Sequence, residues 1–180
     1  MAISARLKAG ESLGDRVMKV DHAGEHGAIC IYRAQIWFAR SRAPEMVGEL
    51  AEFLVHERRH RALFGAELAR RGRRRCRSYH FCGLGGFALG ALTGLLGRRA
   101  IAATTVAIET VVLRHMHEQV AALAANDPAA ADTLRAVIRD EQAHHDLSGR
   151  RLAAPALWPR VINPVVEAST EAVIWLGMRL

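Results

Sequence analysis

Two stretches of the sequence, VHERRHRA (residues 55–62) and RDEQAHHD (residues 139–146), are the most informative about the fold. Each contains a Glu-x-x-His pair, Glu57 with His60 and Glu141 with His144. Residues three apart lie on the same face of an α-helix, so each pair presents a carboxylate and an imidazole side by side. We expect both stretches to be helices that turn these pairs toward one shared site.

Two further glutamates, Glu25 and Glu109, also stand among apolar residues at helical spacing. Burying unpaired carboxylates costs several kcal/mol each, so four buried glutamates require cations beside them. Two divalent metals would balance the charge. One Glu from each of two helices and Glu-x-x-His from each of the other two is the pattern of ferritin-like di-iron and di-manganese bundles. The apolar neighbours that indicate burial are Met18, Ile29, Tyr32, Ile36, Leu50, Phe53, Leu54, Phe64, Leu68, Val106, Val112, Leu113, Met116, Leu134, Val137 and Ile138.

Hydrophobic periodicity predicts an all-α protein: a ferritin-like four-helix bundle with an additional apolar helix in the crossover and a C-terminal helix. Asp127 before Pro128 predicts an N-cap with proline in the first turn. The 180 residues are expected to form a single domain, with residues 1–12 flexible. The expected bundle helices are 13–39, 45–71, 98–125 and 129–150, and the last helix is 164–178, after Pro155 and Pro159.

Residues 78–97, SYHFCGLGGFALGALTGLLG, contain no Asp, Glu, Lys or Arg. This length almost spans a bilayer, but six glycines and flanking arginines favour a buried or membrane-surface helix that faces lipid or a lipid-like substrate. The segment before it is strongly basic in a chain of net charge +7, which fits either a solvated basic turn or an anion-binding surface. Its arginines are Arg70, Arg71, Arg73, Arg74, Arg75 and Arg77.

The cysteines and the N-terminal residues indicate the cellular compartment of the protein. Cys30, Cys76 and Cys82 form no CxxC pattern, which indicates a reducing environment. The first residues lack an apolar core of signal-peptide length. We therefore expect a protein of the cytosol or of the cytosolic face of a membrane.

Residues 56–60, HERRH, also match the H-E-x-x-H zinc protease motif, in which His56 and His60 bind zinc and Glu57 is the base. That interpretation needs a third ligand and leaves the other glutamates and His144 without a role. We therefore interpret His56 as a partly exposed neighbour of the site.

Some further residues are expected beside the metal ligands, and no catalytic residue is expected beyond the ligands themselves. Asp140 is a candidate to hydrogen-bond a ligand histidine and fix its tautomer. Asp21, one turn before Glu25, is a second candidate for the same task. Tyr32 and His115 complete this group.

Oxygen and nitrogen ligands with open coordination positions suit iron or manganese better than a closed zinc site. We expect two iron ions, which together can reduce dioxygen. The ligands alone fit iron storage as well as insertion of oxygen into a C–H bond, so neighbouring motifs must decide.

The motif KVDHAGEHGA (residues 19–28), followed by Ile31, Tyr32 and Gln35, resembles the opening motif of the demethoxyubiquinone hydroxylase (Coq7/CLK-1) family. Residues 85–91 with 95–97 resemble that family's apolar segment, residues 105–109 with His115 its third ligand helix, and residues 139–146 its last. The similarity runs from about residue 15 to the C-terminus, with the motifs in order.

The resemblance implies an O2-dependent di-iron monooxygenase that hydroxylates the ring of a demethoxyubiquinol in ubiquinone biosynthesis. It implies electrons from NADH, although the sequence has no Rossmann fingerprint. By matching motifs, the metal ligands would be Glu25, Glu57, His60, Glu109, Glu141 and His144, which are also the residues that the helix faces indicate.

The resemblance also implies a membrane partner. A polyprenyl quinone would leave the lipid along the apolar segment, and the arginines would hold anionic headgroups. The protein would be a peripheral membrane protein on the cytoplasmic face of the inner membrane. Self-association or membership of a biosynthetic complex is left open.

Four positions depart from the family pattern. Lys19 stands where arginine is common, Cys30 where a basic residue is frequent, and Thr110 in place of the second acid of a Glu-Glu pair. Met116 replaces a frequent tyrosine beside His115. This last change matters most, because a tyrosine near the site can aid electron or proton transfer.

Two further functions compete with quinol hydroxylation. A di-iron tRNA hydroxylase would suit the basic charge, but the charge-free apolar segment argues against nucleic acid as a partner. A non-enzymatic ferritin-like iron carrier would predict cage or dimer surfaces and no lipid-facing segment.

Overall fold

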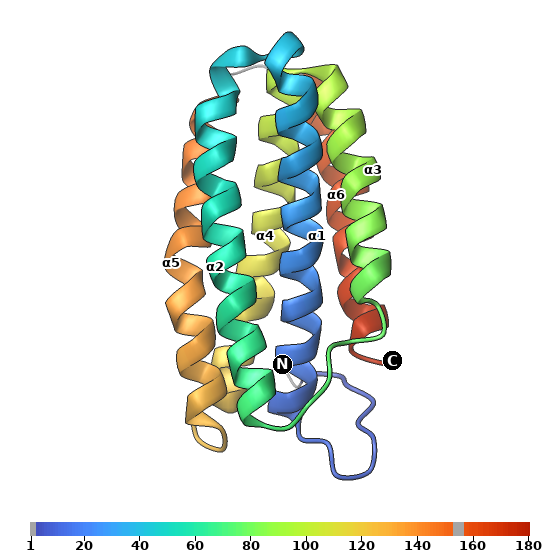
Figure 1. The fold of residues 1–180 in the computed structure, drawn as a ribbon, viewed down its shortest axis with the longest axis vertical. Coiled ribbons are helices and arrows are strands. Elements are labelled where there is room, and N and C mark those ends of the chain that lie inside the picture. Colours follow the sequence, from blue (N-terminus) through green and yellow to red (C-terminus); the bar gives the residue numbers. More distant parts are fainter. Residues whose placement is uncertain (1–2, 153–156) are drawn as a thin grey trace.

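The computed structural model describes residues 3–152 and 157–180, and within them it has six α-helices, one short 3₁₀ helix and no strand. The expectation of an all-α bundle is confirmed, and the helices run side by side along the long axis (Figure 1). They are α1 (Leu13–Arg42), α2 (Val47–Arg70), α3 (Tyr79–Leu96), α4 (Arg98–Leu123), α5 (Pro128–Arg150) and α6 (Leu157–Gly177), with the 3₁₀ helix η1 at Pro44–Met46.

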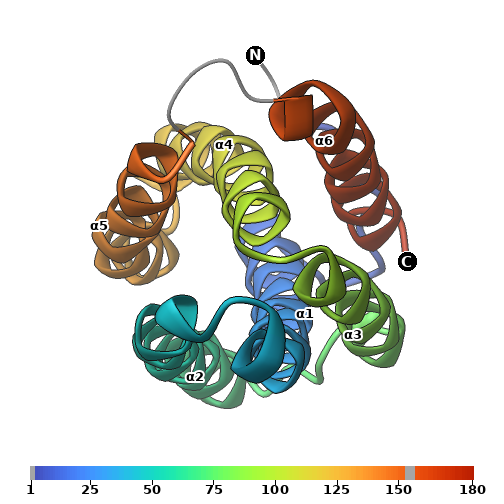
Figure 2. The same cartoon turned by 90° about the horizontal axis from the view of Figure 1, so that it is seen from above.

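Helices α1, α2, α4 and α5 form a four-helix bundle, and α3 and α6 lie along one side of it (Figure 2). The buried apolar residues of the bundle separate into two clusters at different heights. On α1, Val17 and Met18 belong to one cluster and Ile29 and Tyr32 to the other, with Glu25 between them. The core therefore leaves one polar layer at mid-height, enclosed above and below by apolar packing.

Helix α1 begins at a capping box, as Ser12 Oγ accepts a hydrogen bond from Asp15 N at 3.1 Å and Asp15 Oδ2 accepts one from Ser12 N at 3.0 Å. Glu11, directly before this capping box, is buried. Glu11 accepts hydrogen bonds from Arg16 and Lys19, each at 2.6 Å. The flexibility expected for residues 1–12 remains a prediction.

The predicted helix boundaries were accurate at most ends, and two were wrong. Helix α1 continues to Arg42, since only Ala43, which precedes Pro44, leaves the helical conformation. Helix α6 begins at Leu157 rather than at Pro164. Pro159 lies in the first turn, where a missing N–H costs nothing, and the interior Pro164 is tolerated because Ile162 and Val166 bury against α4. Pro155 lies outside the described residues.

Some arginines of the segment between α2 and α3 form ion pairs with other helices. The Arg71 guanidinium lies 2.7 Å from Asp127 and 2.6 Å from Glu67, and Arg73 lies 2.9 Å from Asp15. These pairs join the end of α2 to the first turns of α1 and α5. The interpretation of the whole segment as a solvated basic turn is wrong, because part of its charge holds the helices together. Arg74, Arg75 and Arg77 remain exposed.

Helix α3 packs on α1 through glycines, which brings the two backbones into direct contact. A Cβ atom on Gly86 would overlap the carbonyl oxygen of Gly27, and one on Gly90 would overlap that of Ile31. On the opposite side of α3, a Cβ on Gly85 would meet nothing within 4 Å. Four of the six glycines that argued against a membrane span therefore face α1 and are buried: Gly83, Gly86, Gly90 and Gly94.

Gly90→Ala is expected to destabilise the protein by about 1–3 kcal/mol, because the backbone of α1 cannot move aside as a flexible side chain would. Gly85→Ala is the matched control, and it should be neutral or stabilising by up to about 1 kcal/mol through helix propensity. Urea denaturation of both variants measures the difference. Equal stabilities would contradict the close packing of α1 on α3.

The outer face of α3 is apolar and exposed. Phe81 and Leu84 are 75% and 70% exposed, and Phe87, Leu92 and Leu95 continue the face. Helix α6, which lies on the same side of the bundle as α3 (Figure 2), also has exposed apolar side chains, among them Val165 and Trp175. By length and composition, α3 is the one described helix that could cross a membrane, at a mean hydropathy of 1.3. Its glycine face is covered by α1, and its outer face is exposed.

Candidate metal centre

The six residues predicted as metal ligands meet in the polar layer of the bundle, and none is more than 5% exposed. Glu25 comes from α1, Glu109 from α4, and the two Glu-x-x-His pairs from α2 and α5. They form two overlapping groups whose ligand atoms lie within 4.8 Å of one another: Glu25, Glu57, His60 and Glu141, and Glu57, Glu109, Glu141 and His144. Glu57 and Glu141 belong to both groups, so the layer offers two adjacent cation positions that share two carboxylates.

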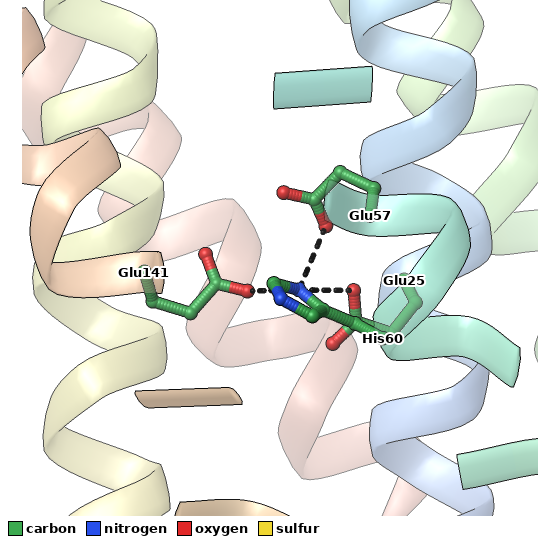
Figure 3. A group of neighbouring side chains, drawn as sticks. All are labelled: Glu25, Glu57, His60 and Glu141. Atoms are coloured by element: carbon green, nitrogen blue, oxygen red, sulfur yellow. Dashed lines mark ion pairs between the residues drawn. The ribbon is translucent and has the colours of Figure 1, made fainter. Parts of the chain in front are cut away.

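Both histidines turn Nδ1 toward the carboxylates. His60 Nδ1 lies 3.0 Å from Glu141 Oε1 and 3.7 Å from Glu25 Oε2 (Figure 3). His144 Nδ1 lies 3.3 Å from Glu141 Oε2 and 3.4 Å from Glu57 Oε1. One nitrogen of each ring therefore faces the centre of the layer, and the other is left for a partner outside it.

Without a cation, protons must balance the charge of this layer. Burial, reinforced by the charge of Glu141, raises the pKa of Glu25, Glu57 and Glu109 well above the usual range. Burial would also raise the pKa of Glu141, but the neighbouring imidazoles of His144 and His60 lower it. Burial would lower the pKa of both histidines, yet Glu141 and Glu57 raise it to about 9. The layer is therefore stabilised by positive charge, supplied either by protons or by bound cations.

Several polar atoms in the layer have no hydrogen-bond partner, although they are buried. They are Glu25 Oε2, Glu57 Oε1, His60 Nδ1 and His144 Nδ1. Buried polar atoms are nearly always paired. Four unpaired oxygen and nitrogen atoms in one layer therefore indicate a cation-binding site. Carboxylate oxygens with imidazole nitrogens are donors that divalent iron or manganese accepts. The residues present could hold a metal ion in each group.

The metal-free protein should lose stability as the pH rises. His60 and His144 have pKa values of about 9 in the folded chain against 6.5 for the unperturbed group, so their stabilisation is complete below pH 6.5 and is lost toward pH 9. The raised pKa values of the glutamates act in the same direction. We expect a loss of a few kcal/mol, or about 5–10 °C in melting temperature, between pH 6.5 and 9.

Thermal unfolding in the presence of a chelator measures this loss. The metal-loaded protein is the control and should lose less, since cations replace the protons. A melting temperature of the chelated protein that stays constant or rises over this pH range would contradict the charge balance described above.

Two of the four residues expected beside the ligands contact them. His60 Nε2 lies 2.9 Å from Asp140 Oδ2, and Arg59 pairs with the same carboxylate. Tyr32 Oη donates a hydrogen bond to Glu109 Oε1 at 3.4 Å. These contacts tie one histidine and one glutamate of the layer to neighbouring helices.

The other two expected neighbours have different partners. Asp21 Oδ1 accepts a hydrogen bond from Gln119 at 3.4 Å, and among the described residues it binds neither His60 nor His144. His115 Nε2 lies 2.9 Å from Glu171 of α6. The prediction that Asp21 orients a ligand histidine was wrong, because it lies a full turn below the layer on α1.

Sequence reasoning missed the partner of His144. His56 Nδ1 lies 3.0 Å from His144 Nε2, across the gap between α2 and α5. His56 belongs to neither metal-holding group, so the H-E-x-x-H interpretation finds no support in the geometry. The signal that could have found this contact is the position of His56 itself, directly before Glu57, as Asp140 is directly before Glu141.

A cavity of about 250 Å³ adjoins the metal layer. It lies among α1, α3, α4 and α6, and its walls are mostly apolar, with Ile108 and Leu89 among them. Its lining includes glutamates of the layer as well as Phe81 of α3 and Val173 of α6, which are exposed. The cavity therefore brings apolar side chains, glutamates of the layer and exposed residues of α3 and α6 around one space.

Comparison with known proteins places this chain among hydroxylases. Residues 12–177 match the family model described as Ubiquinone biosynthesis protein COQ7. The 3-demethoxyubiquinol 3-hydroxylase of Rhodospirillum rubrum is 34% identical over 169 residues, 94% of this chain and 79% of that protein. The mitochondrial NADPH-dependent 3-demethoxyubiquinone 3-hydroxylase of Homo sapiens is 32% identical over 171 residues, 92% of this chain and 77% of that protein. Both matches span the four helices that carry the candidate ligands.

Proposed function

The chain belongs to the Ubiquinone biosynthesis protein COQ7 family, and from this membership we propose that it hydroxylates the ring of a demethoxyubiquinol in ubiquinone biosynthesis. The names of the relatives from Rhodospirillum rubrum and Homo sapiens support this reaction. The observation that carries it in this chain is the buried layer of four glutamates and two histidines at the end of an apolar cavity. The enzyme is a monooxygenase within a single domain.

Two iron ions are the proposed cofactor. Glu25, Glu57, His60 and Glu141 hold one, and Glu57, Glu109, Glu141 and His144 hold the other. The unpaired Nδ1 atoms of the histidines and the unpaired oxygens of Glu25 and Glu57 support this division. When bound, such a pair of iron ions reduces dioxygen and directs one of its atoms to a substrate carbon.

The reaction converts a ring C–H bond into C–OH. One oxygen atom of O2 enters the product, and the other leaves as water with two electrons and two protons from a reductant. A reduced nicotinamide nucleotide supplies the electrons: the resemblance implied NADH, whereas the name of the human relative specifies NADPH. The residues of this chain hold the metals, exclude water from the layer by the two apolar clusters, and guide the ring to the glutamates.

The apolar cavity and the outer face of α3 support a quinol drawn from lipid. The polyprenyl tail would extend past Phe81 toward the membrane, while the ring would reach the layer between Glu25 and Glu109. Exposed Arg74, Arg75 and Arg77 precede α3 and would meet anionic headgroups at about 1 kcal/mol each. The protein would thus lie on the cytoplasmic face of the inner membrane without spanning it.

Mass analysis of cellular quinones tests the proposal. Cells that lack this protein should accumulate the demethoxy precursor, and the wild-type gene should restore ubiquinone. An unchanged quinone pattern, in cells with no second enzyme of this kind, would reject the proposed reaction.

A further inference from the structure

The two candidate ligand histidines are each held from outside by a residue of the opposite helix. His60 on α2 bonds to Asp140 on α5, and His144 on α5 bonds to His56 on α2. Both partners directly precede the glutamate of a Glu-x-x-His pair. The two halves of the site are therefore built alike, except that one half uses a carboxylate where the other uses an imidazole.

The bond between the two imidazoles has good geometry. The ring planes of His56 and His144 are 8° from parallel, and their centroids lie 5.3 Å apart. Their facing nitrogens are only 3.0 Å apart, closer than the roughly 3.5 Å at which stacked rings touch. The rings therefore meet edge to edge in nearly one plane, as an N–H···N hydrogen bond requires.

The direction of this bond follows from the layer. Because His144 Nδ1 faces Glu57 and Glu141, a cation bound there leaves the proton of the ring on Nε2. His144 Nε2–H then donates to Nδ1 of His56, which acts as the acceptor. His56 thus fixes both the tautomer and the rotation of His144.

The partners make the two metal positions unequal. Each position has three carboxylates and one imidazole, so the ligands themselves do not distinguish them. The carboxylate of Asp140 makes the His60 imidazole a stronger donor to a cation, which is the usual effect of such a partner. His56 gives His144 an acceptor without a negative charge.

We propose that His56 is a positioning residue that orients His144 for the second cation, and that the position held by His144 is the weaker of the two. This inference rests on the proposed two-metal site. It assigns a role to the one histidine of the HERRH motif that neither metal group uses.

Calorimetric titration of the metal-free protein with Fe(II), without oxygen, tests the inference. The wild type should bind two ions in two steps of different affinity. His56→Leu should weaken the lower-affinity step by about 10- to 100-fold and leave the other unchanged. His56→Gln should retain both steps, because its amide oxygen can accept the same hydrogen bond. Asp140→Asn should instead weaken the higher-affinity step.

The outcomes separate this inference from the proposed function. A wild type that binds no Fe(II) would overturn the metal site itself. Two wild-type steps that persist unchanged in His56→Leu would overturn only the role of His56. If His56→Leu does not fold, nitrogen-15 NMR of the wild type decides. A coupling between His56 Nδ1 and His144 Nε2 supports the inference, and its absence at neutral pH contradicts it.

Discussion

Replacing Glu141 by alanine is expected to abolish hydroxylation and to remove both metal ions. Glu141 belongs to both metal-holding groups, and its two oxygens face the Nδ1 atoms of His60 and His144 at 3.0 and 3.3 Å. Loss of a partner outside the ligand set typically reduces metal affinity by about 10- to 100-fold, and loss of a shared ligand should exceed this. Iron analysis and an assay of the hydroxylated quinone measure the two effects.

The control for this variant is Glu52→Ala, which removes an exposed glutamate of α2. It should retain two irons per chain and full turnover. Circular dichroism of both variants should match the wild type, since apolar clusters above and below the layer hold the helices. Normal turnover in Glu141→Ala would contradict the assignment of this residue as a shared ligand.

Replacing Leu84 and Phe87 together by aspartate is expected to abolish binding to anionic liposomes. Both side chains lie on the exposed apolar face of α3, 70% and 55% exposed. Burying one such side chain contributes about 1.5–3 kcal/mol, so loss of two should reduce partitioning by about 100-fold or more. Flotation of the protein with vesicles of anionic lipid measures this change.

Val55→Asp is the matched control, because Val55 is also exposed, at 60%, and belongs to α2, which is separated from α3 by α1 (Figure 2). It should float like the wild type. Measuring tRNA binding by the same preparations at equal salt distinguishes quinol hydroxylation from the rival function, a tRNA hydroxylase. Wild-type protein that binds tRNA strongly and does not float would reject the membrane-facing role of α3.

The sequence was sufficient to predict which glutamates and histidines form the buried polar layer, because the information for it is local. Glu57 and His60 lie three residues apart, and helical geometry alone places them on one face. Glu25 and Glu109 could be added because apolar neighbours at helical spacing indicate burial. These are properties of single helices, and the bundle only had to bring four such faces together.

Contacts between helices were harder to predict, because they depend on register. His56 was interpreted only as a partly exposed neighbour of the site, and its contact with His144 results from the antiparallel packing of α2 and α5. Arg71 was counted as a surface charge, yet Asp127 at the start of α5 is its partner. The glycines of α3 were interpreted only as an argument against a membrane-spanning helix. Their close packing on α1 could be recognised only from the structure.

The most direct test of the account is turnover of a demethoxyubiquinol with oxygen-18 gas by the purified iron-loaded protein. We predict a hydroxylated product that carries one oxygen-18 atom, formed by protein that holds two irons per chain. The product should be absent with Glu141→Ala. Protein that holds two irons and is supplied with reductant, yet forms no product or forms product with oxygen from water, would contradict the account.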